Sequence, residues 1–171
     1  MGDPIEDYDR IASSKGNRWL VGAAGAVVNA GRVLLIRYGH GKRKGLWSLP
    51  GGYAVPWERL DQTVVREIQE ETGVRAEVVD VIGIRTRCTE RGGGVFVLFR
   101  LKPLLGEPNP DGTEVDRAKY FSADQIQAMP HDEILTIARN AGLAALNHRR
   151  GLTPDDRAPG SGDAYRAFLL M

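Results

Sequence analysis

Three glutamates, Glu67, Glu70 and Glu71, stand at positions i, i+3 and i+4 of one stretch of the sequence. In a helix this spacing places the three carboxylates on one face, within a turn of one another. Like charges at that distance repel, so we expect a cation to compensate them. Carboxylate oxygens that converge from one side suit Mg²⁺ or Mn²⁺, and substrate phosphates complete the coordination of these ions. The spacing therefore indicates a divalent metal site, and the competing interpretation is a solvated acidic helix face.

The residues around the glutamates indicate the helix that must position them. Leu60, Val64 and Ile68 recur every four places between residues 60 and 72, which predicts one buried stripe. Gly73 follows at the point where a helix needs a left-handed residue to end. The sequence therefore predicts a helix that ends directly after the acidic cluster.

A loop precedes this helix, and its glutamate Glu58 lies eight residues before Arg66. A guanidinium and a carboxylate so placed can form a bidentate ion pair that holds the loop against the helix. Gly51 and Gly52 open the same loop. Because the glycine pair, Glu58, the Arg-Glu dipeptide and the final glycine occur together, we favour the metal site over a solvated helix face.

The stretch from Gly52 to Val74 fits the spacing G-x5-E-x7-R-E-U-x-E-E-x-G-U, in which U is aliphatic. The fixed positions are Gly52, Glu58, Arg66, Glu67, Ile68, Glu70, Glu71, Gly73 and Val74. The stretch thus resembles the signature sequence of the Nudix hydrolases, with every fixed position filled. The resemblance implies an α/β (α+β) fold, an α/β/α sandwich with a mixed sheet. It also implies metal-dependent hydrolysis of the pyrophosphate bond in a nucleoside diphosphate linked to another moiety, such as a nucleotide sugar or ADP-ribose.

The resemblance also implies roles for individual residues, with Mg²⁺ as the cofactor and Mn²⁺ as a substitute. The expected metal ligands are the side chains of Glu67, Glu70 and Glu71 and the backbone carbonyl of Gly51. The expected structural supports of the site are Gly52, Glu58, Arg66 and Gly73. The expected catalytic carboxylates are Glu70, Glu71 and Glu114. Glu114 stands six residues before Tyr120, where family members often carry a metal ligand or base, and Asp116 is the alternative.

Two positions inside the stretch depart from the family pattern. Members commonly carry a Glu and a Gly where this sequence has Val55 and Trp57. The missing carboxylate removes one potential ligand, so fewer metal ions are expected. Because Trp does not easily take the positive φ open to Gly, we expect a differently shaped loop. We expect Trp57 to pack across the loop, with stacking on a substrate base as the alternative.

Several residues outside the acidic cluster are candidates for contacting the substrate. The basic loop from Gly39 to Gly45 leads directly to the glycine pair, although such a loop is more commonly a solvated connection. Arginines on a predicted hairpin after the helix could also bind phosphate. The candidate substrate contacts are Arg37, Arg43, Trp57 and Arg85.

Composition limits the class of protein. The 171 residues suffice for one domain with a hydrophobic core. A formal net charge of +1 gives no overall attraction to nucleic acid or to a membrane, and the longest apolar run is far too short for a membrane span. The family resemblance implies a small-molecule nucleoside diphosphate derivative as the partner. The single cysteine, Cys88, favours the cytoplasm, and no signal peptide is evident. We expect a lead-in over residues 1–18, a Nudix domain over 19–148 and a tail over 149–171.

Apolar patterns predict the remaining elements. Four stretches predict strands: 19–28, 33–38, 75–88 and 95–105. We expect the glycines at 92–94 to form a turn, a capping box at Ser122 to open a short helix, and a longer helix to follow over 132–147. The apolar terminus over 165–171 is expected to fold back on the domain or to cross to a second subunit in a homodimer.

Other functions stay open on the sequence alone. The same chemistry would serve a house-cleaning nucleoside triphosphate pyrophosphohydrolase, and no downstream submotif identifies one substrate. A catalytically silent domain that senses a nucleotide is a second alternative, which the intact glutamate cluster disfavours. Isomerisation of a prenyl diphosphate would need cysteine chemistry, and Cys88 lies in a predicted strand.

Overall fold

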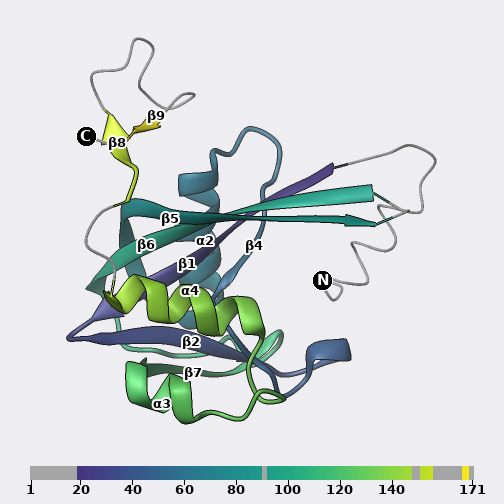
Figure 1. Cartoon of the computed structure of the whole chain (residues 1–171), viewed down its shortest axis with the longest axis vertical. Helices are drawn as coiled ribbons and strands as arrows, with labels where there is room; N and C mark the ends of the chain where they lie inside the picture. Colours follow the sequence, from purple (N-terminus) through teal and green to yellow (C-terminus); the bar gives the residue numbers. More distant parts are fainter. Residues whose placement is uncertain (1–18, 90–91, 148–150, 156–166, 170–171) are drawn as a thin grey trace.

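The computed structural model describes residues 19–89, 92–147, 151–155 and 167–169, so the expected lead-in over 1–18 lies outside the described residues. In that part of the chain, seven strands form one sheet around β1 (Figure 1). The strands are β1 (Trp19–Asn29), β2 (Arg32–Tyr38), β3 (Trp47–Ser48), β4 (Gly51–Tyr53), β5 (Arg75–Thr89), β6 (Gly92–Leu105) and β7 (Val115–Ser122). The helices are η1 (Gly41–Arg43), α2 (Leu60–Thr72), α3 (Ala123–Ala128) and α4 (Thr136–Asn147). The sheet is mixed because β1 runs parallel to β6 and antiparallel to β2 and β4.

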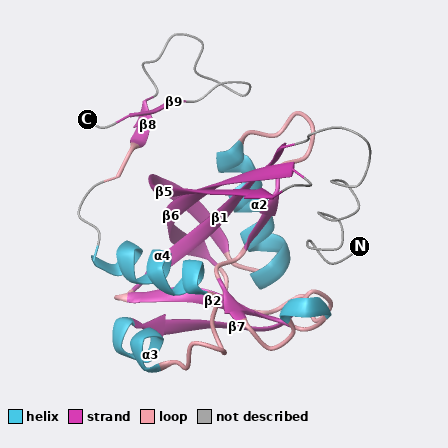
Figure 2. Ribbon diagram, turned by 45° about the vertical axis from the view of Figure 1, so that its right-hand side comes forward, coloured by secondary structure: helices cyan, strands magenta, loops and turns pink. Residues whose placement is uncertain are grey.

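Helices cover both faces of the sheet (Figure 2). Leu34 and Leu35 are consecutive and fully buried on β2, so their side chains point to opposite faces. Leu34 belongs to the core that contains Val64 and Ile68 of α2. Leu35 belongs to the core that contains Ala138 of α4. The expected α/β/α sandwich with a mixed sheet is therefore confirmed.

Helix α2 forms as its apolar spacing predicts, and it ends at Gly73. That residue has φ 69° and donates its N–H to the carbonyl of Gln69 at 2.9 Å. The helix lies very close to β1, because a Cβ added at Gly25 would meet Ile68 at 2.6 Å and Val64 at 2.8 Å. Small residues on β1 thus allow α2 to approach the sheet.

Two predicted boundaries were wrong. The glycines at 92–94 do not form a turn but extend β6, and a Cβ at Gly93 would lie 2.7 Å from the ring of Trp19. The bare backbone there lets the indole lie over the strand. The helix predicted over 132–147 begins only at Thr136. Residues 131–133 instead form a turn, and Ile134 forms a parallel bridge with Trp47, whose backbone exchanges hydrogen bonds with Glu133 and Leu135.

The sheet opens between β1 and β2, and the site residues lie at that opening. β1 pairs with β2 at Val28 and Asn29, whereas its earlier part pairs with β4 at Gly22 to Ala24. Farther along its own length, β2 pairs with β3. The N–H of Gly25 donates to Pro50 O at 2.9 Å, and this bond fixes the turn between β3 and β4. The glycine pair of β4 therefore enters the middle of the fold.

The described parts of the C-terminal segment contact the domain. Leu152 forms an antiparallel bridge with Val81 at the edge of the sheet. Phe168, on the short strand β9 (Ala167–Leu169) that pairs with β8 (Thr153–Asp155), meets Phe99 edge to face at 5.5 Å between ring centroids. The apolar terminus thus folds back on its own chain at Phe168.

Among the helices of the described residues, none has the length and apolar character needed to cross a membrane.

Candidate active site

Arg66 of α2 ties the preceding loop to the helix. Its Nε donates to Glu58 Oε1 at 2.8 Å and its Nη2 donates to Glu58 Oε2 at 3.0 Å. Nη2 also donates to the carbonyl of Tyr53 at 3.3 Å. The predicted bidentate ion pair is confirmed, and it holds the loop between β4 and α2 in place.

The same guanidinium reaches two of the three clustered glutamates. Arg66 Nη1 donates to Glu67 Oε1 at 2.8 Å and to Glu70 Oε2 at 2.9 Å. The Glu67 side chain is 17% exposed, whereas that of Glu70 is 58% exposed. Glu70 therefore lies toward the outer side of α2, and Glu67 lies toward the glycine pair.

Glu71 faces the glycine pair from inside the protein. It is buried, and its Oε2 accepts a hydrogen bond of 2.8 Å from the N–H of Gly51. Gly51 has φ 151°, and a Cβ there would lie 2.3 Å from the carbonyl of Ala23. At Gly52 an added Cβ would lie 2.4 Å from Glu67 Oε1. Both glycines are thus required by close approaches to β1 and to the carboxylates.

Burial and neighbouring negative charges raise the pKa values of Glu67 and Glu71. Burial raises the pKa of Glu71 well above its ordinary value; the Gly51 N–H lowers it, and the negative charges of Glu67, Glu114 and Asp111 raise it further. Burial likewise raises the pKa of Glu67; Arg66 opposes this, while Glu70 and Glu114 add to it. Glu114 therefore lies within electrostatic reach of both Glu67 and Glu71.

A divalent cation fits the charge of this cluster. No group of three or more His, Cys, Asp or Glu side chains is arranged to hold a metal ion within the described residues. The reason is local, because Arg66 binds Glu67 and Glu70 while Glu71 turns to Gly51. Glu71 and the half-buried Glu67 nevertheless have pKa values that burial and the neighbouring carboxylates raise, and such oxygen donors suit a hard cation that would relieve their charge.

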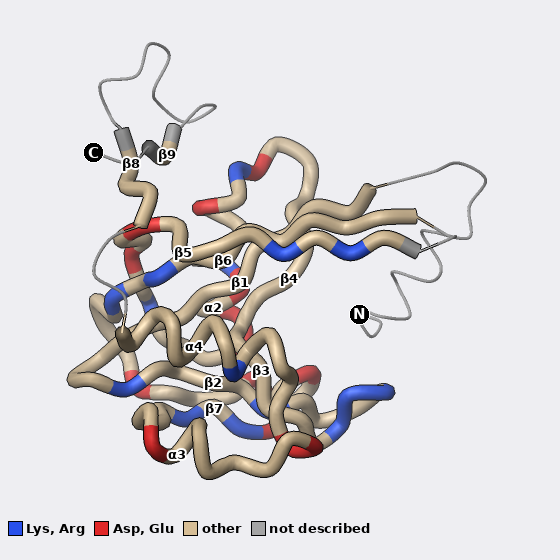
Figure 3. Tube along the Cα trace, in the orientation of Figure 1, with Lys and Arg blue, Asp and Glu red and all other residues tan. Residues whose placement is uncertain are grey.

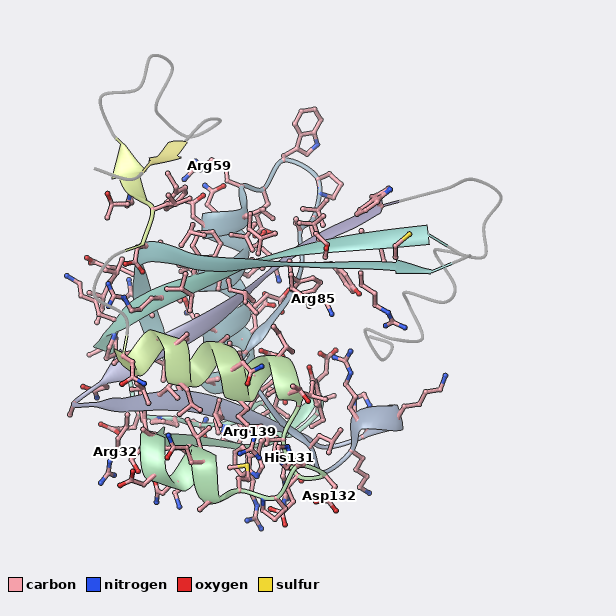
Figure 4. All side chains as sticks on the ribbon, viewed as in Figure 1. Arg32, Arg59, Arg85, His131, Asp132 and Arg139 are labelled. Carbon is pink, nitrogen blue, oxygen red and sulfur yellow. The ribbon has the colours of Figure 1, made fainter. Side chains whose placement is uncertain are left out.

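A pocket of about 90 Å³ opens beside the glycine pair. Its lining combines apolar side chains with two arginines and contains no acidic residue: Ala24, Tyr38, Arg43, Ser48, Leu49, Gly51, Gly52, Tyr53, Arg85, Phe96, Leu98, Leu135, Ile137 and Ala138. The guanidinium of Arg85 lies 4.8 Å from the ring centroid of Phe96, and that of Arg43 lies 5.6 Å from the ring centroid of Tyr38. Figure 4 shows Arg85 reaching from β5 toward α4. Two of the predicted substrate contacts, Arg43 and Arg85, therefore share one pocket.

Arg37 does not line that pocket. Its Nε and Nη2 donate to the two carboxylate oxygens of Asp116 at 2.8 and 2.6 Å, in a largely exposed pair between β2 and β7. Asp116 is thereby paired, whereas the negative charge of Glu114 acts on both Glu67 and Glu71. The basic loop that contains η1 lies at the lower right of Figure 3. Lys42 in this loop is exposed, whereas Arg43 is half-buried and lines the pocket.

Two expectations for Trp57 were wrong. Trp57 takes φ 70°, in the left-handed region that we expected it to avoid. Its side chain is fully exposed and does not pack across the loop. It borders an open groove on the outer side of α2, together with Glu58 and Glu70. The next residue, Glu58, is held by its ion pair with Arg66.

Sequence reasoning missed three polar residues near the cluster: Tyr38, Ser48 and Asp111. Tyr38 and Ser48 stand on β2 and β3 and line the pocket. Asp111 accepts backbone hydrogen bonds from Thr113 and Val115 and so shapes the loop that carries Glu114. The only signal for Asp111 was its place beside a glycine in a predicted loop, and Tyr38 and Ser48 gave none.

Arg139 is a further buried residue that the sequence did not indicate. It lies between α4 and α3 in Figure 4. Its guanidinium donates to the carbonyls of Ile126 at 2.7 Å and Gln127 at 3.1 Å, and also to those of Met129 and Pro130. These carbonyls follow or end α3, so Arg139 stabilises the end of that helix. Arg139 therefore stabilises the fold.

Comparison with known proteins connects these features to a family. Residues 19–139, most of the chain, match the family model described as NUDIX domain. The protein named nucleoside diphosphate-linked moiety X motif 6 from Homo sapiens is 31% identical over 141 residues, which are 80% of this chain and 44% of that protein. The chain also spans less than two thirds of the proteins of that name from Mus musculus and Xenopus laevis.

Two further similar proteins match this chain over a larger share of their own length. An ADP-ribose pyrophosphatase from Methanocaldococcus jannaschii is 29% identical over 119 residues, 67% of this chain and 70% of that protein. The crystal structure of a MutT NUDIX hydrolase from Burkholderia pseudomallei superimposes with a TM-score of 0.64 at 26% identity, over 73% of this chain and 96% of that chain.

Proposed function

The chain belongs to the Nudix family, and we propose that it hydrolyses the pyrophosphate bond of a nucleoside diphosphate linked to another moiety, with Mg²⁺ or, in its place, Mn²⁺. The observation that carries this proposal is the position of Gly51 and Gly52. Gly51 donates to Glu71 and Gly52 lies against Glu67, and both glycines also line the pocket that contains the two arginines. A substrate in the pocket would bring its phosphates against the cluster.

Each residue of the cluster has a role in this proposal. Glu67 and Glu71 would hold the cation, with Glu70 and the carbonyl of Gly51 as further ligands. The bound cation would supply Lewis-acid polarisation of the phosphoryl oxygens and a more acidic water. Glu114 would take the proton from the attacking water, since it lies within electrostatic reach of Glu67 and Glu71.

Arg66 and Glu58 would act through positioning. Their bidentate pair fixes the loop that carries the glycine pair, and Arg66 holds Glu67 in its orientation. In the substrate half of the site, Arg43 and Arg85 would meet negative charge while the apolar walls exclude water. The similar proteins named for nucleoside diphosphate-linked moieties and for ADP-ribose support this class of substrate.

A substrate panel tests the proposal. The chain is incubated with Mg²⁺ and nucleotide sugars, ADP-ribose, dinucleotides or nucleoside triphosphates, and the released phosphates are identified. We expect release of a nucleoside monophosphate and the phosphorylated partner moiety, and about 10²–10⁴-fold less of both with Glu71→Gln. Turnover restricted to triphosphates would favour the house-cleaning activity, and tight binding without turnover would favour a nucleotide sensor.

Glu77→Gln provides the matched control for Glu71→Gln. Glu77 lies outside the cluster, where it pairs with Lys102 at 2.8 Å and is exposed on β5. We expect Glu77→Gln to keep full activity. Equal loss in both variants would count against a specific role of the cluster.

A further inference from the structure

We propose that Tyr38, Arg43 and Ser48 form a phosphate-binding subsite in the pocket beside Gly51, in which Tyr38 positions Arg43 and also donates to the phosphate. The inference rests on the proposed function. One phosphate of the substrate would lie at the cation, and this subsite would bind the other. Nothing in the family comparison assigns these three residues.

The first observation is the contact between Arg43 and Tyr38. The Arg43 guanidinium lies over the Tyr38 ring, 5.6 Å from its centroid, and its Nη1 donates to the Tyr38 hydroxyl at 3.3 Å. A guanidinium has five N–H donors in a planar fork. Within the described residues this contact uses one of them, so the fork can meet the oxygens of a phosphate.

The second observation is the frame that fixes this pair. Gly45 donates its N–H to the Tyr38 carbonyl at 2.8 Å, and Tyr38 donates its own N–H to Leu46 O at 3.1 Å. The loop that carries Arg43 is therefore closed on Tyr38 at its base. Ser48 is buried on β3 and lines the same pocket, and its side chain acts to lower the pKa of the Tyr38 phenol. Guanidinium, phenol and hydroxyl are thus held side by side.

The third observation is where this trio lies. All three residues line the pocket together with Gly51, whose N–H holds Glu71. The negative charge of Glu71 acts on Tyr38, since it helps burial to raise the pKa of the phenol. The trio therefore stands next to the carboxylate cluster, but its wall of the pocket carries positive charge and no carboxylate. An anion is the ligand that this wall fits.

Phosphate is the anion that matches the chemistry. A tetrahedral phosphate offers several strong acceptor oxygens to a planar guanidinium and two hydroxyls, and it can belong to a substrate or be free inorganic phosphate. Inorganic phosphate binding and substrate kinetics distinguish these sources. The first measures the subsite without turnover, and the second measures its use during the reaction.

Tyr38→Phe tests the proposal because it keeps the ring under Arg43 and removes the hydroxyl. Tyr120→Phe is the matched control, since Tyr120 is a partly buried tyrosine on β7 outside the pocket. We expect Tyr38→Phe to weaken inorganic phosphate binding by about 10- to 100-fold, as for one hydrogen bond to a charged group. KM should rise by a similar factor with kcat within about twofold of wild type. Tyr120→Phe should change neither quantity.

Arg43→Met keeps the test valid if Tyr38→Phe does not fold. We expect it to weaken phosphate binding at least as strongly. Wild-type phosphate affinity in both folded variants would overturn the subsite, and so would equal weakening in Tyr120→Phe. Loss of phosphate binding in an enzyme that hydrolyses no member of the panel would keep the subsite and refute the proposed function.

Discussion

Glu71 Oε2 accepts a hydrogen bond of 2.8 Å from the backbone N–H of Gly51, and this contact joins the acidic helix to the glycine pair from the inside. It gives the carboxyl of Glu71 a hydrogen-bond partner in its buried position. Burial and the neighbouring carboxylates raise the pKa of this carboxyl well above its ordinary value, and the N–H of Gly51 lowers it. We expect a bound cation to relieve the cost of burying the ionised form.

Glu71→Gln is therefore expected to stabilise the metal-free protein while it removes activity. Because the pKa of Glu71 is raised in the folded state, ionisation costs stability as pH rises above the ordinary value of 4.5. Glutamine does not ionise and can still accept from Gly51. Urea unfolding in EDTA should show the variant to be more stable at neutral pH, with a difference that shrinks toward pH 4.5. Activity should fall by about 10²–10⁴-fold.

Glu58→Gln should make the stability depend less on acid pH. Arg66 holds the pKa of Glu58 below its ordinary value of 4.5. The ion pair therefore stabilises the folded protein fully above pH 4.5, and this stabilisation is lost as pH falls through the lowered pKa. We expect the variant to unfold about 1–2 kcal/mol more easily at neutral pH, allowing for partial exposure. Denaturant unfolding from pH 7 to pH 2 measures this, and a constant difference over the range would contradict it.

Glu114→Gln separates the two candidate bases. Glu114 acts on Glu67 and Glu71, whereas Asp116 is paired with Arg37. We expect Glu114→Gln to lower kcat by about 10²–10⁴-fold with little change in KM. Asp116→Asn should keep kcat and cost about 0–1 kcal/mol of stability, as is usual for an exposed pair. The reverse pattern would assign the base to Asp116.

Gly52→Ala tests the close approach of β4 to the carboxylates. The new Cβ would lie 2.4 Å from Glu67 Oε1, so Glu67 must move away. We expect activity to drop by about 10–100-fold, the range seen when the surroundings of a metal ligand are disturbed. Gly83→Ala on β5 is the control, because its Cβ would meet Leu98 at an ordinary 3.6 Å. Circular dichroism should show that both variants fold.

The sequence predicted the parts of this fold that local patterns encode. Helix α2 followed from the spacing of Leu60, Val64 and Ile68 and from a glycine that can take positive φ. The Arg66–Glu58 pair followed from its spacing in the signature stretch. Both are contacts between residues close in the chain, so the pattern contains almost all of their geometry.

Long-range contacts decided what the sequence did not predict. Residues 133–135 have a helical pattern but pair with Trp47, which lies far away in the chain. The pocket brings Tyr38 and Ser48 together with Phe96 from another strand, and no spacing reveals that. Trp57 takes a backbone conformation that its side chain disfavours, and Glu58, the next residue, is held by its ion pair with Arg66.

Equilibrium binding of Mn²⁺, followed by electron paramagnetic resonance, tests most directly whether Glu67 and Glu71 bind a divalent cation. The measurement compares wild type with Glu67→Gln, Glu71→Gln and the surface control Glu77→Gln. We expect the first two variants to lose more than about tenfold in affinity, since removing a ligand should cost at least as much as disturbing its surroundings. Glu77→Gln should bind as wild type does. Undiminished Mn²⁺ affinity in both cluster variants would contradict the account.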